Sequence, residues 1–214
     1  MPFLAPVPPT GPILLRSPML CLLILDRDAL PDAAALAALR ARAPGLRIHL
    51  RIDAAETPGP ALALAPDGVA APVAGPGDLG RLANRLAVHE AEAGLPDGAT
   101  GIVGLIGSAA CVLGAAGLAG ASPRLAGLAW DAEALAADLG IALDRSAAWP
   151  APLAQARGQV VLAARVAGVP AFETVRRDSA SLAGTAEAAR LDGFAGIAVR
   201  DPAEAALVAA QPPL

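Results

Sequence analysis

The chain has 214 residues, of which 55% are hydrophobic and 17% are charged, and its formal net charge is −4. It contains no lysine, so all 16 basic residues are arginines, which excludes a lysine Schiff base and a lysine-bearing phosphate loop. The negative net charge disfavours a nucleic-acid partner, and the high apolar content predicts a folded chain with a buried core.

Strand and helix patterns alternate along the chain from residue 20 onward. Apolar segments bounded by turn-forming residues predict seven β-strands, at residues 20–25, 46–52, 68–73, 102–106, 125–130, 169–175 and 194–199. Helices are predicted at residues 31–42, 78–93, 109–121, 132–139, 153–167, 179–191 and 202–210, and a proline-rich stretch at 57–66 replaces one helix. Residues 13–16 are a candidate for an eighth strand, and residues 1–14 are expected to be largely irregular.

Repeated strand–helix units require parallel pairing and right-handed crossovers. Seven or eight such units in one chain of this length predict an α/β fold, a compact TIM-type (β/α)8 barrel with a reduced or missing first βα unit. An open, doubly wound sheet is the alternative. No linker divides the chain, so residues 1–214 are expected to form a single domain.

The longest uncharged run, residues 101–123, is long enough to cross a bilayer but is rich in glycine and alanine. A buried strand, a turn at Gly107 and Ser108 and a following helix describe it better. We therefore expect no membrane segment, no targeting peptide and a cytoplasmic protein. Cys21 and Cys111 have no metal-ligand spacing and are expected to be buried free thiols. His49, inside a strand, and His89, on the apolar stripe of the predicted helix 78–93, are both expected to be structural.

Charged residues follow most of the predicted strands, and in a barrel the carboxyl ends of the strands carry the chemistry. Carboxylates that converge there would suit a hard cation such as Mg²⁺, whereas their ordinary role is to cap the next helix. Arg51 ends an apolar strand and could bind a substrate carboxylate bidentately, through two of its guanidinium nitrogens. The other candidates at strand ends are Asp26, Asp28, Asp131, Glu133, Glu173 and Arg200.

An ordered set of short motifs extends from about residue 15 to 206. It includes Ile24-Leu-Asp-Arg-Asp-Ala-Leu-Pro-Asp32, Leu50-Arg-Ile-Asp53, Ala93-Gly-Leu-Pro96, Ser122-Pro-Arg-Leu125, Leu135-Ala-Ala-Asp-Leu-Gly140, Leu162-Ala-Ala-Arg-Val-Ala-Gly-Val-Pro170 and Gly193-Phe-Ala-Gly196. In these motifs the chain resembles the β subunit of citrate lyase and its relatives in the HpcH/HpaI aldolase/citrate lyase superfamily. The resemblance implies a TIM-type barrel that cleaves or forms C–C bonds in acyl-CoA thioesters such as citryl-CoA and malyl-CoA.

The resemblance also implies a site, and the chain departs from it at the strand ends. Arg51 stands at the position of the arginine that binds the substrate carboxylate. The Glu and the Asp that hold Mg²⁺ in the family fall at Gly107 and Ala134, and the strand-end lysine falls at Val73. Mg²⁺ binding is therefore expected to be weak or lost, and no covalent cofactor is implied. Our hypothesis is a catalytically degenerate member that keeps the barrel.

Two further readings remain open. In the first, the chain is an active C–C lyase or thioesterase with a rearranged site, in which Asp131 or Glu133 substitutes for the missing ligands beside Arg51. In the second, it is a non-catalytic partner subunit of an active paralogue. The expected ligand is an acyl-CoA or a small carboxylate, and the resemblance implies a homo-oligomer, such as a trimer, or a hetero-oligomer. An unrelated nucleotide-binding protein would need a phosphate cradle, which no glycine cluster here provides.

Overall fold

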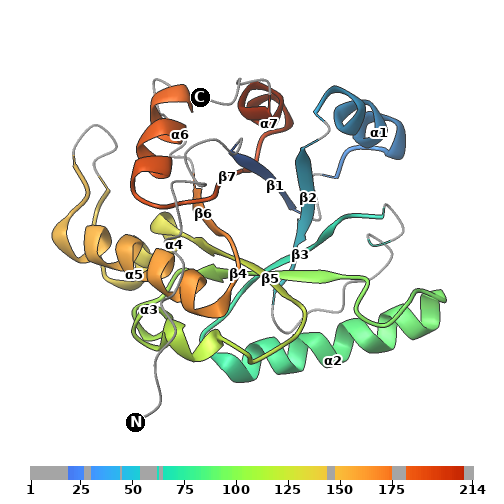
Figure 1. Cartoon of the computed structure of the whole chain (residues 1–214), viewed down its shortest axis with the longest axis horizontal. Helices are drawn as coiled ribbons and strands as arrows, with labels where there is room; N and C mark the ends of the chain where they lie inside the picture. Colours follow the sequence, from blue (N-terminus) through green and yellow to red (C-terminus); the bar gives the residue numbers. More distant parts are fainter. Residues whose placement is uncertain are drawn as a thin grey trace, which may run out of the picture.

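The computed structural model describes residues 19–26, 30–43, 45–53, 62, 65–143, 148–174 and 182–209. Its seven described strands form one closed parallel barrel in the order β1-β2-β3-β4-β5-β6-β7, and the helices lie outside it (Figure 1). The last strand pairs directly with the first, Leu20 opposite Gly196 and Leu23 opposite Val199. The predicted TIM-type barrel is confirmed, and it closes without an eighth strand from the described part of the chain.

The strands all lie where the apolar segments predicted them. They are β1 (Leu20–Asp26), β2 (Leu46–Arg51), β3 (Gly68–Pro72), β4 (Gly101–Ile106), β5 (Leu125–Trp130), β6 (Ala171–Thr174) and β7 (Gly196–Val199). Residues 1–14, the candidate strand 13–16 and most of the stretch 57–66 lie outside the described residues. Cys21 and Cys111 are buried free thiols, as predicted.

The helices agree with the predictions in order but differ at their ends. They are α1 (Ala33–Arg42), α2 (Pro76–Ala93), α3 (Ala109–Gly114), the 3₁₀ turn η4 (Ala115–Leu118), α4 (Ala132–Asp138), α5 (Ala151–Ala167), α6 (Leu182–Leu191) and α7 (Pro202–Ala209). The α1 helix begins two residues later than Pro31 because Asp32 caps it, its side chain accepting a hydrogen bond from the Ala35 amide at 2.7 Å. Within the described residues, no helix combines the length and the apolar character that crossing a bilayer requires.

Small residues make room inside the barrel for two ring-bearing side chains. A Cβ added to Gly127 or Gly196 would lie 2.7 or 2.8 Å from the ring of Phe172, and one added to Gly68 would lie 2.8 Å from Nε2 of His49. Contacts this close are forbidden, so glycine is required at these strand positions. The interior core otherwise consists of Leu22, Ile24, Ala70, Val103, Leu105, Ala129 and Ala198.

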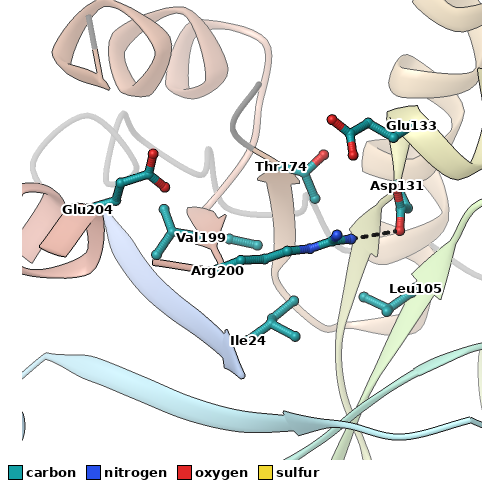
Figure 2. A pocket seen from close by; sticks show the side chains of 9 residues that line it. Ile24, Leu105, Asp131, Glu133, Thr174, Val199, Arg200 and Glu204 are labelled. Carbon is teal, nitrogen blue, oxygen red and sulfur yellow. Dashed lines mark hydrogen bonds and ion pairs between the residues drawn. The ribbon is translucent and has the colours of Figure 1, made fainter. Parts of the chain in front are cut away.

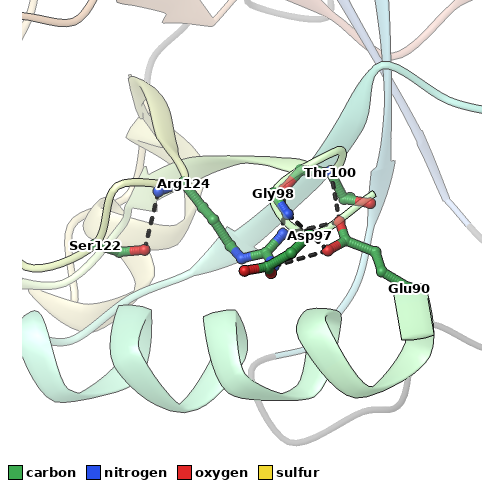
Figure 3. A network of polar contacts seen from close by, with 6 residues as sticks. All are labelled: Glu90, Asp97, Gly98, Thr100, Ser122 and Arg124. Atoms are coloured by element: carbon green, nitrogen blue, oxygen red, sulfur yellow. Dashed lines mark hydrogen bonds and ion pairs between the residues drawn. The ribbon is translucent and has the colours of Figure 1, made fainter. Parts of the chain in front are cut away.

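A buried ion pair anchors the end of α2 to the loops before β4 and β5 (Figure 3). The sequence placed His89 on the buried stripe of this helix, but the structure buries Glu90 instead, with no exposed surface. Two guanidinium nitrogens of Arg124 donate to the Glu90 carboxylate at 2.7 and 2.8 Å, and the amides of Thr100 and Gly98 donate at 2.7 and 2.9 Å. Burial alone raises the pKa of Glu90, but these donors outweigh it and lower the pKa to about 2.

His49 is buried in the barrel without compensating hydrogen bonds. Its side chain is 5% exposed, and neither ring nitrogen has a hydrogen-bond partner in the described part of the chain. Burial disfavours the imidazolium form and lowers the pKa of His49 to about 4, although the charge of Asp67 acts in the opposite direction. The ring is therefore neutral at physiological pH, in keeping with the structural role expected for it.

Removal of Arg124 is expected to destabilise the fold. Arg124→Met would leave the Glu90 carboxylate buried and unpaired, which costs about 3–5 kcal/mol of the free energy of unfolding. The matched control Arg81→Met breaks an exposed pair with Asp78 and is expected to cost less than about 1 kcal/mol. Urea denaturation measures both values, and equal costs for the two variants would contradict this assignment.

Acid sensitivity is expected to depend on His49. The pKa of His49 in the folded state lies below its ordinary value of 6.5. Above pH 6.5 the ring is neutral in both the folded and the unfolded chain, so its titration does not lower the free energy of unfolding there. The free energy of unfolding decreases as the pH falls from 6.5 to 4, because only the unfolded chain takes up the proton in this range. His49→Leu should flatten the melting temperature across this range. A variant that keeps the wild-type slope would show that other groups cause it.

Candidate functional site

The carboxyl ends of the strands surround a small pocket, as barrel chemistry predicts (Figure 2). Its volume is about 60 Å³, room for roughly four water molecules or a few heavy atoms of a ligand. The pocket can thus take the head of a short organic acid. It is lined by Ile24, Leu105, Asp131, Glu133, Thr174, Ala198, Val199, Arg200 and Glu204.

Asp131 is the centre of the charged groups at this mouth. Its Oδ2 atom lies 3.3 Å from Nη2 of Arg200 and 4.0 Å from Nη1 of Arg51, and its side chain is only 7% exposed. Its Oδ1 atom caps α4 by accepting a hydrogen bond from the Ala134 amide at 3.1 Å. Arg51 also lies 4.0 Å from the exposed carboxylate of Asp26. One carboxylate is therefore shared by two arginines from opposite ends of the sequence.

The two positions that the resemblance assigns to the metal-binding residues lie next to each other, beside Asp131. A Cβ added to Gly107 would lie 2.7 Å from the Cβ of Ala134 and 3.3 Å from the Cβ of Asp131. Neither residue has a ligand atom in its side chain, and Asp131 already faces two guanidinium groups. Across the described residues, no three His, Cys, Asp or Glu side chains converge on a point that could hold an ion. The residues present do not fit a Mg²⁺ site.

The remaining predicted candidates are divided between the pocket and other places. Glu133 lines the pocket and makes a polar interaction of its own. Glu173 points away from the mouth, where it accepts hydrogen bonds from Nε1 of Trp130 and Nε of Arg157, on α5. Burial raises the pKa of Glu173, and Arg157 opposes this shift. Glu173 therefore joins a helix to the barrel, and Asp28 lies outside the described residues.

No local pattern in the sequence pairs Arg200 with Asp131, 69 residues away. The signal that was present is strand alternation: Gly196 and Ala198 face the barrel interior, so Arg200 continues the same side at the mouth. Figure 2 shows its side chain reaching across the pocket, above Ile24, to the Asp131 carboxylate. Thr174 also lines the pocket, and its hydroxyl donates to the Trp130 carbonyl at 2.9 Å.

The close approach of Gly107 and Ala134 predicts a steric coupling. Gly107→Ala should lower the free energy of unfolding by about 1–3 kcal/mol because the new methyl group overlaps that of Ala134. The same change in an Ala134→Gly background should cost clearly less, which a double-mutant cycle by urea denaturation measures. Gly80→Ala, on α2 with no atom within 4 Å, is the control and should be neutral or stabilising. Additive costs at the two sites would contradict the coupling.

Comparison with known proteins supplies the family. The family model of the HpcH/HpaI aldolase/citrate lyase matches residues 27–201. Among solved structures, RipC from Yersinia pestis is 24% identical over 91% of this chain and 95% of its own, with a TM-score of 0.62. The citrate lyase β subunit from M. tuberculosis, solved with oxaloacetate and magnesium, is 24% identical over 91% and 97% (TM-score 0.61). A citrate lyase from Burkholderia xenovorans is 15% identical over 92% and 78% (TM-score 0.72).

The solved structures and the family model support different conclusions. No curated protein sequence shows a significant match to the chain. The solved structures are all below 25% identity, so they show a shared fold alone. The family model spans most of the sequence, including β2 to β7 and the residues of the pocket mouth from Arg51 to Arg200. The chain therefore belongs to the HpcH/HpaI aldolase/citrate lyase family.

Proposed function

We propose that this protein binds a small carboxylate and has lost the Mg²⁺-dependent C–C lyase reaction on acyl-CoA thioesters. The observation that carries the proposal is the packing of Gly107 against Ala134. The space where a metal-binding side chain would begin is occupied by the Ala134 methyl group, 2.7 Å from a Cβ at position 107. Both missing carboxylates map to this point, and nothing in the described surroundings replaces them.

The electrostatics of the mouth support the same conclusion. Mg²⁺ is held in proteins by carboxylate oxygens that are not neutralised by other cations. Here the carboxylate nearest to Gly107 belongs to Asp131, which is paired with Arg200 and Arg51. A divalent cation would have to displace two guanidinium groups from that carboxylate. Enolate stabilisation by a metal ion is therefore not assigned to this pocket.

The features that favour carboxylate binding are still in place. Arg51 stands at the strand end where the family binds the substrate carboxylate, and its side chain is 27% exposed, so solvent reaches it. The floor of the pocket is apolar, formed by Ile24, Leu105 and Ala198, which suits the short carbon chain of an acid.

A rearranged active site is the second candidate function. Glu133 and Asp131 line the same pocket, and the Glu133 carboxylate points toward it in Figure 2. In a thioesterase, such a carboxylate would act as a general base toward water without a metal. In this reading Asp131 stays ion-paired and Glu133 is the catalytic residue. A role as the partner subunit of a paralogue stays a prediction that co-purification would test.

Metal titration and turnover assays separate these functions. We expect calorimetry to show no saturable Mg²⁺ binding below about 1 mM, because Gly107 and Ala134 carry no oxygen ligand and the nearest carboxylate, that of Asp131, is paired with two arginines. Citryl-CoA and malyl-CoA should undergo no C–C cleavage with or without Mg²⁺. Saturable Mg²⁺ binding together with cleavage would overturn the proposal. Hydrolysis of the thioester without C–C cleavage, lost in Glu133→Gln, would establish the second candidate instead.

A further inference from the structure

We infer that the ligand of this pocket is a monocarboxylate, held without a metal by the guanidinium groups of Arg51 and Arg200 in competition with Asp131. The inference rests on the proposed function and adds to it the second anchoring arginine, the charge of the ligand and the internal competitor. It follows from three features of the pocket: two converging arginines, a surplus of carboxylates around them, and the shared use of Asp131.

The first feature is the convergence of the two guanidinium groups. They approach a single carboxylate oxygen, at 3.3 and 4.0 Å, from strand ends that are far apart in the sequence. Arginine binds carboxylates through a planar fork of N–H donors, and only part of each fork is used by Asp131. The arginine side chains are 27% and 35% exposed, whereas Asp131 is 7% exposed. A ligand carboxylate can therefore approach both arginines from the open side.

The second feature is the charge of the lining, which admits one negative charge and disfavours two. Among the described residues, the carboxylates of Asp131 and Glu204 line the pocket and Asp26 lies beside Arg51, against the two arginines Arg51 and Arg200. Burial raises the pKa of Glu204, and the charge of Asp201 acts in the same direction. A second carboxylate on the ligand would face these groups instead of a cation. The apolar floor suits an uncharged remainder.

The third feature is the double role of Asp131. Its Oδ1 atom caps α4. Its Oδ2 atom is paired with the guanidinium groups of the two arginines, as a ligand carboxylate would be. Asparagine also caps helices well, so Asp131→Asn keeps the cap and removes the charge. This substitution should free both arginines for the ligand. A carboxylate that served as a metal ligand would give the opposite result, since its loss would abolish binding.

The test uses two probes that differ by one charge. Monoethyl malonate presents a single carboxylate, as a half-thioester does, and malonate has the same skeleton with two carboxylates; propionate represents a free monocarboxylic acid. Calorimetry in the presence of a chelator and at constant ionic strength should give a dissociation constant of about 1 mM for the half-ester. Malonate should bind about fivefold more weakly or not at all, because its second carboxylate meets the carboxylate of Glu204. Comparable binding of propionate would identify a free acid as sufficient, whereas binding of the half-ester alone would identify the half-thioester; both outcomes support a monocarboxylate.

The variants have matched controls. Arg200→Gln and Arg51→Gln should each weaken the half-ester about tenfold through loss of a charge-assisted pair. Arg81→Gln removes the same charge from the exposed face of α2 and should change nothing. Asp131→Asn should tighten binding about fivefold, with a melting temperature close to that of the wild type. Glu92→Gln, at an exposed position of α2, is its control.

Failure of this inference and failure of the proposed function give different results. If malonate binds as tightly as its half-ester, if the two arginine variants bind normally, or if Asp131→Asn weakens binding, the inference is overturned while the proposed function stands. If the half-ester binds only when Mg²⁺ replaces the chelator, and C–C cleavage accompanies it, the proposed function is overturned as well. No binding of any probe to the well-folded Asp131→Asn variant also overturns the inference.

Discussion

The pairing of β1 with β7 is the constraint on which the rest of this structure depends. It closes seven short strands into one ring, so every strand has a hydrogen-bonded neighbour on both sides. Closure also brings the end of the last strand to the same mouth as the ends of β2 and β5. Only for this reason can Arg200, Arg51 and Asp131 share one set of charges. The narrow interior is the consequence, and glycines on several strands accommodate Phe172 and His49.

Buried charged groups are arranged differently at two places in the protein, one of which supports the stability of the fold and the other its function. At the end of α2, Glu90 and Arg124 are both buried, and Glu90 also accepts hydrogen bonds from two backbone amides. This satisfied pair has little remaining capacity for a ligand. At the barrel mouth, Asp131 is buried but its two arginines are partly open to solvent, so their hydrogen-bonding capacity is not exhausted. The first arrangement fixes the fold, and the second leaves a site at which a carboxylate can compete.

The predictions for the site differ in outcome because strand alternation decides which way a side chain points. Arg51 and Asp131 were expected at strand ends, and the structure places them 4.0 Å apart, with Asp131 in the lining of the pocket. Glu173 was expected there too, but it precedes Thr174 by one residue and so faces the opposite side of β6, toward Arg157. Gly107 and Ala134, the positions that the resemblance assigns to the metal ligands, lie side by side, since a Cβ at position 107 would be 2.7 Å from that of Ala134. Arg200 was a strand-end candidate, but its contact with Asp131 could not be predicted, because the two residues are distant in the sequence.

The sequence by itself determined the alternation of strands and helices, the barrel and the family, because apolar periodicity and turn residues act locally and recur along the chain. It also determined that Gly107 and Ala134 have no metal-binding atoms. Only the tertiary structure decided that seven strands close into a barrel and that Asp131 is shared by two arginines. It also decided that Glu90, and not His89, joins the buried leucines of α2. These features depend on strand register and on contacts between residues far apart in the chain, which one strand's pattern does not specify.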